Sequence, residues 1–188
     1  MTVRVTLISP ATNAGLREAR FGGDGPLDPE GERRARAAAL ALPSDAAHRC
    51  GLSGRCRATA AALGLEAVPE PALREWEMGR WTGLRLSEVT EADPAGVEVW
   101  LRDPDAQPHG GESLNGLVAR VGGWLDRTDP ADGPFVAVAE PAVVRAAVVH
   151  ALRLPPETFW RLDVAPLTAT RLVGRAGRWN LTIGHPWA

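Results

Sequence analysis

Short apolar runs rich in β-branched residues alternate along this chain with segments that carry helix signals. The clearest predicted strands are 3–9, 134–139, 168–173 and 178–183. The predicted helices are 28–42, 55–63, 114–128 and 141–152. Strands that alternate with helices favour a three-layer α/β/α sandwich with a mostly parallel sheet. A chain of 188 residues with 45% hydrophobic content is long enough to bury such a core as a single domain over 1–188.

Local signals set several of these boundaries. Asp28 followed by Pro29 is a typical helix start, and the apolar pattern continues from there to about Leu42. A weak strand at 48–53 precedes an Arg- and Ala-rich helix that Gly64 ends. The strand ends predict where a ligand would bind, because α/β sheets hold ligands at the carboxyl ends of their parallel strands.

The segment 68–113 carries repeated Pro, Gly and Trp with only short helical patches, such as 86–92, and is interpreted as an excursion over the site. Its tryptophans, Trp76, Trp81 and Trp100, are predicted to lie in the core or a lid. The alternative is that they line an apolar or cation-accepting cavity.

Charge and composition exclude several classes of protein. The net charge is only −2 and the basic residues form no long stripe, so no nucleic acid partner is expected. No apolar stretch reaches about 18 residues and Met1–Val5 leads directly into a strand, which predicts a cytoplasmic protein without membrane contact. Cys50 and Cys56 are expected to be reduced thiols. The sequence implies no cofactor and no metal, and it leaves a homodimer open.

Several segments, in this order, resemble the histidine phosphatase superfamily, in its phosphoglycerate-mutase-like branch. They are Arg20–Gly23, Pro26–Gly31, Leu73–Gly83, Gly110–Ser113, Val143–Leu152 and Ala165–Leu172. The resemblance covers nearly the whole chain and implies a phosphoglycerate-mutase-like fold. It also implies a phosphate pocket made of two arginines and two histidines, with an acid as proton donor.

The resemblance breaks at the residue that should carry the chemistry. The family has an Arg-His-Gly motif after its first strand, in which the histidine attacks phosphorus; the matching residues here are Ser9, Pro10 and Ala11. The spacing from Asn13 to Phe21 fits the family pattern without a gap. A prolyl nitrogen within a chain is an amide without a basic lone pair, so Pro10 cannot accept a phosphoryl group.

The rest of the implied pocket is partly retained. The family's second histidine falls at Glu140, the helix arginine is Arg55 and the proton-donating acid is Glu75. One arginine against two carboxylates suits a phosphate dianion poorly, so we expect the preference for anions to be weakened or reversed. Glu140 is either a replacement acid or base paired with Glu75, or the salt-bridge partner of Arg55 in a vacated pocket. Glu75 either donates a proton or caps the loop that contains Trp76.

Six further residues are predicted to line this pocket: Ser9, Pro10, Asn13, Arg20, His109 and Glu112. His109 would supply the only imidazole near the pocket, but a histidine in a Pro-flanked polar loop is more often exposed to solvent.

The remaining metal-ligand residue types are interpreted as structural. The trio His48, Cys50 and Cys56 has no recognised metal spacing. His150 lies on an apolar helix, and His185 lies in the tail.

Three functions remain open. The favoured one is a non-catalytic pseudo-phosphatase that acts as a binding module for an unknown small molecule or protein. The second is an enzyme with a rebuilt pocket, in which Glu75 and Glu140 are acid and base and Arg55 holds an anionic part of the substrate. The third is a residual phosphomonoesterase. A closed Arg55–Glu140 contact would favour the first, and an open cleft with both acids facing it would favour the second.

Overall fold

A mixed sheet of six strands forms the centre of the protein in the computed structural model, which describes residues 2–39, 46–175 and 177–183. The strands are β1 (Val3–Ile8), β2 (Ala47–Cys50), β3 (Val68–Pro69), β4 (Phe135–Val138), β5 (Ala169–Arg175) and β6 (Arg178–Thr182). Their order is β3-β2-β4-β1-β5-β6. The first four pair in parallel, while β5 and β6 are antiparallel to their neighbours. The mostly parallel sheet predicted from the sequence is confirmed.

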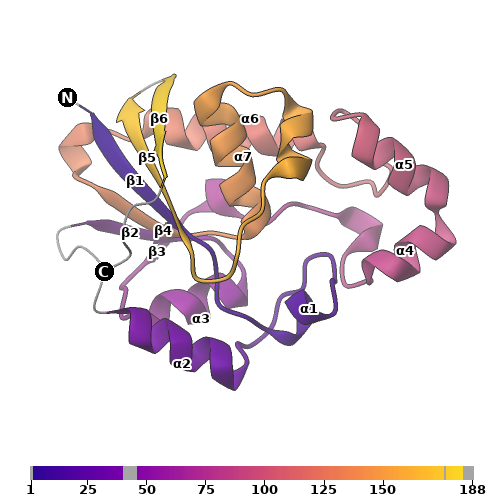
Figure 1. Ribbon diagram of the computed structural model, residues 1–188, viewed down its shortest axis with the longest axis horizontal. Coiled ribbons are helices and arrows are strands. Elements are labelled where there is room, and N and C mark those ends of the chain that lie inside the picture. Colours follow the sequence, from indigo (N-terminus) through magenta and orange to yellow (C-terminus); the bar gives the residue numbers. More distant parts are fainter. Residues whose placement is uncertain (1, 40–45, 176, 184–188) are drawn as a thin grey trace.

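Helices cover both faces of this sheet, as Figure 1 shows. One face carries α2 (Pro29–Ala38) and α3 (Gly54–Ala62), and the other carries α6 (Leu114–Arg127) and α7 (Pro141–Leu152). Three further helices, α1 (Ala14–Arg17), α4 (Leu86–Ala92) and α5 (Pro94–Arg102), lie toward one end of the sheet. The three-layer α/β/α arrangement follows.

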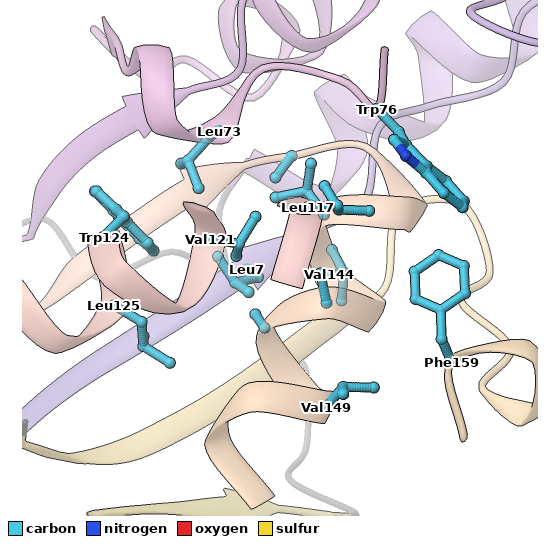
Figure 2. Packing of buried hydrophobic residues seen from close by; sticks show 14 of the residues in the cluster. Leu7, Leu73, Trp76, Leu117, Val121, Trp124, Leu125, Val144, Val149 and Phe159 are labelled. Atoms are coloured by element: carbon cyan, nitrogen blue, oxygen red, sulfur yellow. The ribbon is translucent and has the colours of Figure 1, made fainter. Parts of the chain in front are cut away.

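Alternation along the strands supplies two cores. Val5 and Leu7 of β1 point to the face of α6 and α7, whereas Ile8 points to the face of α2 and α3. In Figure 2, side chains of α6 and α7 converge on Leu7, among them Val121 and Val144. All of these residues are at most 1% exposed. Because successive strand residues point to opposite faces, a strand buried on both sides must be apolar throughout.

Capping residues fix where the main helices begin. Asp28 accepts a hydrogen bond from the Gly31 amide at the start of α2, and Ser53 accepts one from the Cys56 amide at the start of α3. These side chains satisfy amides that lack a partner in the first turn. Gly64, with φ of +73°, follows the end of α3, as predicted. The predicted end of α2 at Leu42 lies outside the described residues.

The elements α1, β3 and α5 were not predicted, and among the strands β2 differs most from its predicted bounds. α1, β3 and α5 have only four, two and nine residues. The start of α5 carries the same Asp-Pro signal as α2, since Asp93 accepts a hydrogen bond from the Gly96 amide. The strand predicted at 48–53 ends at Cys50, because the following residues lead into the Ser53 cap of α3.

Candidate functional site

Three parallel strands end side by side, and the candidate site lies at their carboxyl ends. The ends of β1 and β2, Ile8 and Cys50, both pair with Val138 of β4. The segments that follow these strands therefore leave the sheet together. They carry Pro10, the Ser53 cap of α3, and Glu140.

A buried ion pair lies at the carboxyl ends of these strands. Arg55 Nη2 lies 3.0 Å from Glu140 Oε2, and both side chains are only 6% exposed. The other Glu140 oxygen accepts a hydrogen bond of 2.8 Å from the Ser53 hydroxyl. Arg55 Nε and Nη2 have no aligned hydrogen-bond acceptor among the described residues, so the contact is a charge pairing and not a bidentate fork. The predicted salt bridge between Arg55 and Glu140 is present.

Asp24 places a second carboxylate at the same point, and the sequence analysis missed it. Its oxygens accept the backbone N–H groups of Gly54 and Arg55, each at 3.0 Å, at the N-terminus of α3. Burial acts to raise the pKa of Asp24, but hydrogen bonds from Gly54, Arg55 and Gly25 outweigh it and lower the pKa. The amide groups and dipole at a helix N-terminus attract anions, and here the protein supplies the anion itself. The signal in the sequence is weak, because the contact joins residues 30 apart.

Glu75 is the third acid of the site. Its side chain is partly exposed, and burial raises its pKa to about 8. The negative charge of Glu140 adds to this effect, and the positive charge of Arg55 opposes it. At neutral pH the Glu75 carboxyl is therefore mainly protonated and is a hydrogen-bond donor.

Glu112 supports the segment that carries Glu75. Its carboxylate accepts two hydrogen bonds from Arg120, of 2.8 and 2.6 Å. Arg120 in turn donates to the carbonyl oxygens of Ala72 and Arg74, beside Glu75 in the chain. Glu112 was predicted to line the pocket; its carboxylate here positions this loop through Arg120.

Three other predicted lining residues make structural contacts. The Ser9 hydroxyl donates to the carbonyl oxygen of Ala165, and Asn13 caps α1 by accepting from the Leu16 amide. Arg20 lies at the surface, where its guanidinium pairs with Glu18. Each of these side chains uses its polar atoms within the fold rather than on the Arg55 pair.

The expectation that His109 is solvent-exposed is wrong, since the residue is only 1% exposed. Its Nδ1 accepts a hydrogen bond from the Gly111 amide, and its ring packs against Trp81 with centroids 5.1 Å apart. Burial lowers the pKa of His109, and the charge of Arg80 lowers it further. The glycines that follow His109 allow this loop to approach segment 77–79 closely, because a Cβ at Gly111 would lie 1.9 Å from the Glu77 carbonyl oxygen. This close approach lets aromatic rings cover the imidazole.

The tryptophans of the excursion pack into the core. Trp76, Trp81 and Trp100 are each at most 7% exposed, and the Trp100 ring contacts the other two with centroids 5.5 and 5.6 Å apart. Phe159 and Trp160 complete this aromatic cluster. The rings fill the space between the excursion and the sheet, as the core interpretation predicts.

The remaining candidates show no metal-binding arrangement. Cys50 and Cys56 are buried free thiols, and burial raises the pKa of both. Within the described ranges, no three His, Cys, Asp or Glu side chains are arranged to hold a metal ion. His150 contacts Asp126, with 2.9 Å between Nε2 and Oδ2, and His185 lies outside the described residues. None of the helices that the structure describes is long and apolar enough to cross a bilayer.

A comparison with protein-family models identifies the fold and the order of these segments. The model of the histidine phosphatase superfamily (branch 1) matches residues 10–183. The chain belongs to this superfamily. Its six-stranded mixed sheet with helices on both faces is therefore a histidine phosphatase fold.

Relatives in this superfamily are named as phosphatases. The chain is 31% identical over 136 residues to a glucosyl-3-phosphoglycerate phosphatase of Mycobacterium tuberculosis, covering 66% of this chain and 56% of the relative. It is 31% identical over 104 residues to phosphoserine phosphatase 1 of Hydrogenobacter thermophilus, covering 54% of this chain and 49% of the relative. The chain spans about half the length of these two curated relatives, and 19% of a bifunctional protein of M. tuberculosis that it matches over 68 residues.

Solved structures agree with this assignment. A mycobacterial glucosyl-3-phosphoglycerate phosphatase in complex with VO3 superposes with a TM-score of 0.79 at 25% identity, covering 96% of this chain and 97% of that one. The α-ribazole phosphatase of Shigella flexneri has a TM-score of 0.84 at 18% identity, covering 99% and 98% of the two chains, and supports the fold alone.

Proposed function

We propose that this protein is a non-catalytic member of the histidine phosphatase superfamily that acts as a binding module for a small molecule or a protein. One observation carries the proposal: carboxylates of the protein already bind the Arg55 guanidinium and the backbone amides at the start of α3, which are the groups that would bind a phosphate. Glu140 lies on the Arg55 guanidinium, and Asp24 lies on the backbone amides that open α3.

Charge argues against phosphate at this position. Glu140 places a negative charge on Arg55, and Asp24 places another at the N-terminus of α3, where the positive charge of Arg57 offsets part of it. Each carboxylate brought within about 4 Å of a phosphate charge costs roughly 4 kcal/mol at an effective dielectric constant of about 20. A phosphate dianion would have to displace both carboxylates and leave them near itself.

Pro10, in the segment that follows β1, argues against the family's reaction. By the resemblance described above, Pro10 stands at the position of the nucleophilic histidine, and its amide nitrogen cannot take a phosphoryl group. The mycobacterial glucosyl-3-phosphoglycerate phosphatase forms complexes with VO3 and with inorganic phosphate. We propose that this chain no longer binds phosphate or vanadate at this position. We also propose that the protein is located in the cytoplasm.

The rebuilt-enzyme alternative has one observation in its favour. The pKa of Glu75 is raised to about 8, close to the value that suits a general acid at neutral pH. Against it, Glu140 would be the base, and its carboxylate is held by Ser53 and Arg55. The closed pair therefore favours the binding module.

Phosphatase assays and ligand binding test the proposal together. We expect no hydrolysis of p-nitrophenyl phosphate or sugar phosphates above background, no acid-labile phosphoryl group on the protein, and no thermal shift with vanadate. A thermal-shift screen of other metabolites should then show stabilisation, because a ligand of the native state raises its apparent stability. Steady phosphate release that disappears in Arg55→Ala would overturn the proposal.

A further inference from the structure

One of the pockets of the protein lies beside α7, and neither Arg55 nor Glu140 lines it. It has a volume of about 270 Å³ and lies between α7, segment 162–164, the start of β5 and the end of β6. Most of its wall is aliphatic: Val144, Val148, Leu162, Val164, Leu181 and Ile183. The pocket is smaller than the usual range of drug-sized sites, so its size fits a small ligand.

Arg145 is the cation of this pocket. Its guanidinium lies over the Phe159 ring, 5.5 Å from the ring centroid, and is about half-buried. Within the part of the chain that the structure describes, the guanidinium makes no salt bridge, and its buried Nε has no hydrogen-bond partner. Burial lowers the pKa of Arg145, and the charge of Asp163 only partly opposes this. A half-buried guanidinium without an acceptor favours the entry of an anion.

The other polar residues limit which anion fits. Asp163 lines the same pocket but forms no salt bridge with Arg145 among the described residues. Its negative charge disfavours a dianion such as phosphate and leaves room for a single negative charge. Thr170 and Thr182 are the other polar residues of the wall, and neither carries a charge.

We propose that this pocket binds a small aliphatic monocarboxylate, with its carboxylate on Arg145 and its hydrocarbon part against the valine and leucine wall. A guanidinium binds a planar carboxylate with two parallel hydrogen bonds, and the aliphatic wall stabilises a branched chain by burial. The site goes beyond the proposed function, because it needs neither the presence nor the loss of phosphatase chemistry at Arg55.

Calorimetry with isocaproate, its uncharged amide and inorganic phosphate tests the charge requirement. We expect saturable binding of one isocaproate per chain, and binding at least about tenfold weaker for isocaproamide, since charged hydrogen bonds are the stronger ones. Phosphate should show no binding at this pocket. Absence of saturable isocaproate binding, or equal binding of the amide, would overturn the proposal.

Three variants locate the binding. Arg145→Met keeps an unbranched side chain over Phe159 but removes the charge, and it should lower isocaproate affinity at least about tenfold. Arg33→Met, at an exposed position on α2, makes the same change in net charge and should bind as the wild type does. Asp163→Asn removes a like charge and should strengthen binding, a gain that unfolding cannot imitate. Undiminished binding in Arg145→Met, or unchanged affinity in Asp163→Asn, would refute the assignment.

Sedimentation separates a small ligand from a second copy of the chain. We expect isocaproate to bind without changing the sedimentation of the protein. A dimer that dissociates in Arg145→Met would show that a second copy of the chain binds at the pocket, and it would overturn the proposal. Neither result depends on the phosphatase assays at Arg55, so the two proposals fail separately.

Discussion

At the scale of single residues, the Arg55–Glu140 contact decides how the site behaves. Both side chains are almost fully buried, and among the described residues neither one makes another salt bridge. A buried ion pair adds little to stability in comparison with an apolar pair, but loss of one partner leaves a charge without compensation. The pair should therefore matter most when one member is removed.

A double-mutant cycle measures this coupling. Arg55→Met or Glu140→Gln alone should lower the free energy of unfolding by roughly 3–5 kcal/mol, and the double variant should lose much less than the sum. The exposed pair Arg102 and Glu98 is the control, since its coupling should not exceed about 0.5 kcal/mol. Denaturant unfolding gives all the values. Additive losses at Arg55 and Glu140 would show that Glu140 is a free acid in a reactive site.

Glu75 predicts an unusual dependence of stability on pH. Its pKa is raised from 4.5 to about 8, so the folded protein holds a proton that the unfolded chain releases. The contribution of Glu75 to stability should therefore be greatest below about pH 4.5 and should be lost as the pH rises to about 8. Asp24 acts in the opposite direction and in a lower range, because its lowered pKa makes stability fall only as acid protonates it.

The measurement is unfolding in denaturant across this pH range. Glu75→Gln should remove most of the slope, whereas Glu77→Gln, at an exposed neighbouring position, should keep it. A slope that is unchanged in Glu75→Gln would show that the carboxyl titrates normally. Glu75 would then have no special role as a proton donor.

At the scale of elements, the N-terminus of α3 shows how the protein fills its own anion site. Asp24→Ala removes the acceptor of two backbone amides and should cost about 1 kcal/mol, the usual effect of a lost helix cap. It should also allow vanadate to bind weakly, because the amides and Arg55 then lack one competing carboxylate. Asp28→Ala at α2 is the control: it should lower stability without vanadate binding. A variant of Asp24 that gains no binding would show that Glu140 alone excludes the anion.

The elements also show what the sequence could predict. The start of α2 follows from Asp28 with Pro29, because a cap is a local interaction between residues three positions apart, and α6 follows from the helical spacing of its apolar residues. β3 has two residues, too few for any periodicity, and it exists only through pairing with β2. Asp24 at α3 and the burial of His109 depend on contacts between distant segments, which one sequence does not reveal.

At the scale of the whole molecule, Asp126 joins three parts of the fold. Its carboxylate accepts hydrogen bonds from the Gly177 amide and from Trp179 Nε1 in the β5–β6 hairpin, and it contacts His150 of α7. Burial acts to raise the pKa of Asp126, but these donors lower it overall. Gly122 lets α6 approach α7, since a Cβ there would lie 2.1 Å from the His150 ring. The antiparallel edge of the sheet thus has a polar connection to the helical layer at Asp126, beside the apolar packing of Leu172 and Trp179.

Asp126→Ala should therefore loosen the β5–β6 hairpin before the rest of the sheet. The buried Trp179 N–H and its neighbours would lose their acceptor, which should lower stability by roughly 2–3 kcal/mol. Amide hydrogen exchange should become faster in β6 while β1 and β4, buried between two helical layers, keep their protection. Asp129→Ala, which removes only an exposed cap of the 130–132 turn, should leave both patterns unchanged. Equal acceleration in β1 and β6 would show that the hairpin and the parallel strands unfold as one cooperative unit, and that Asp126 stabilises the whole sheet rather than its edge.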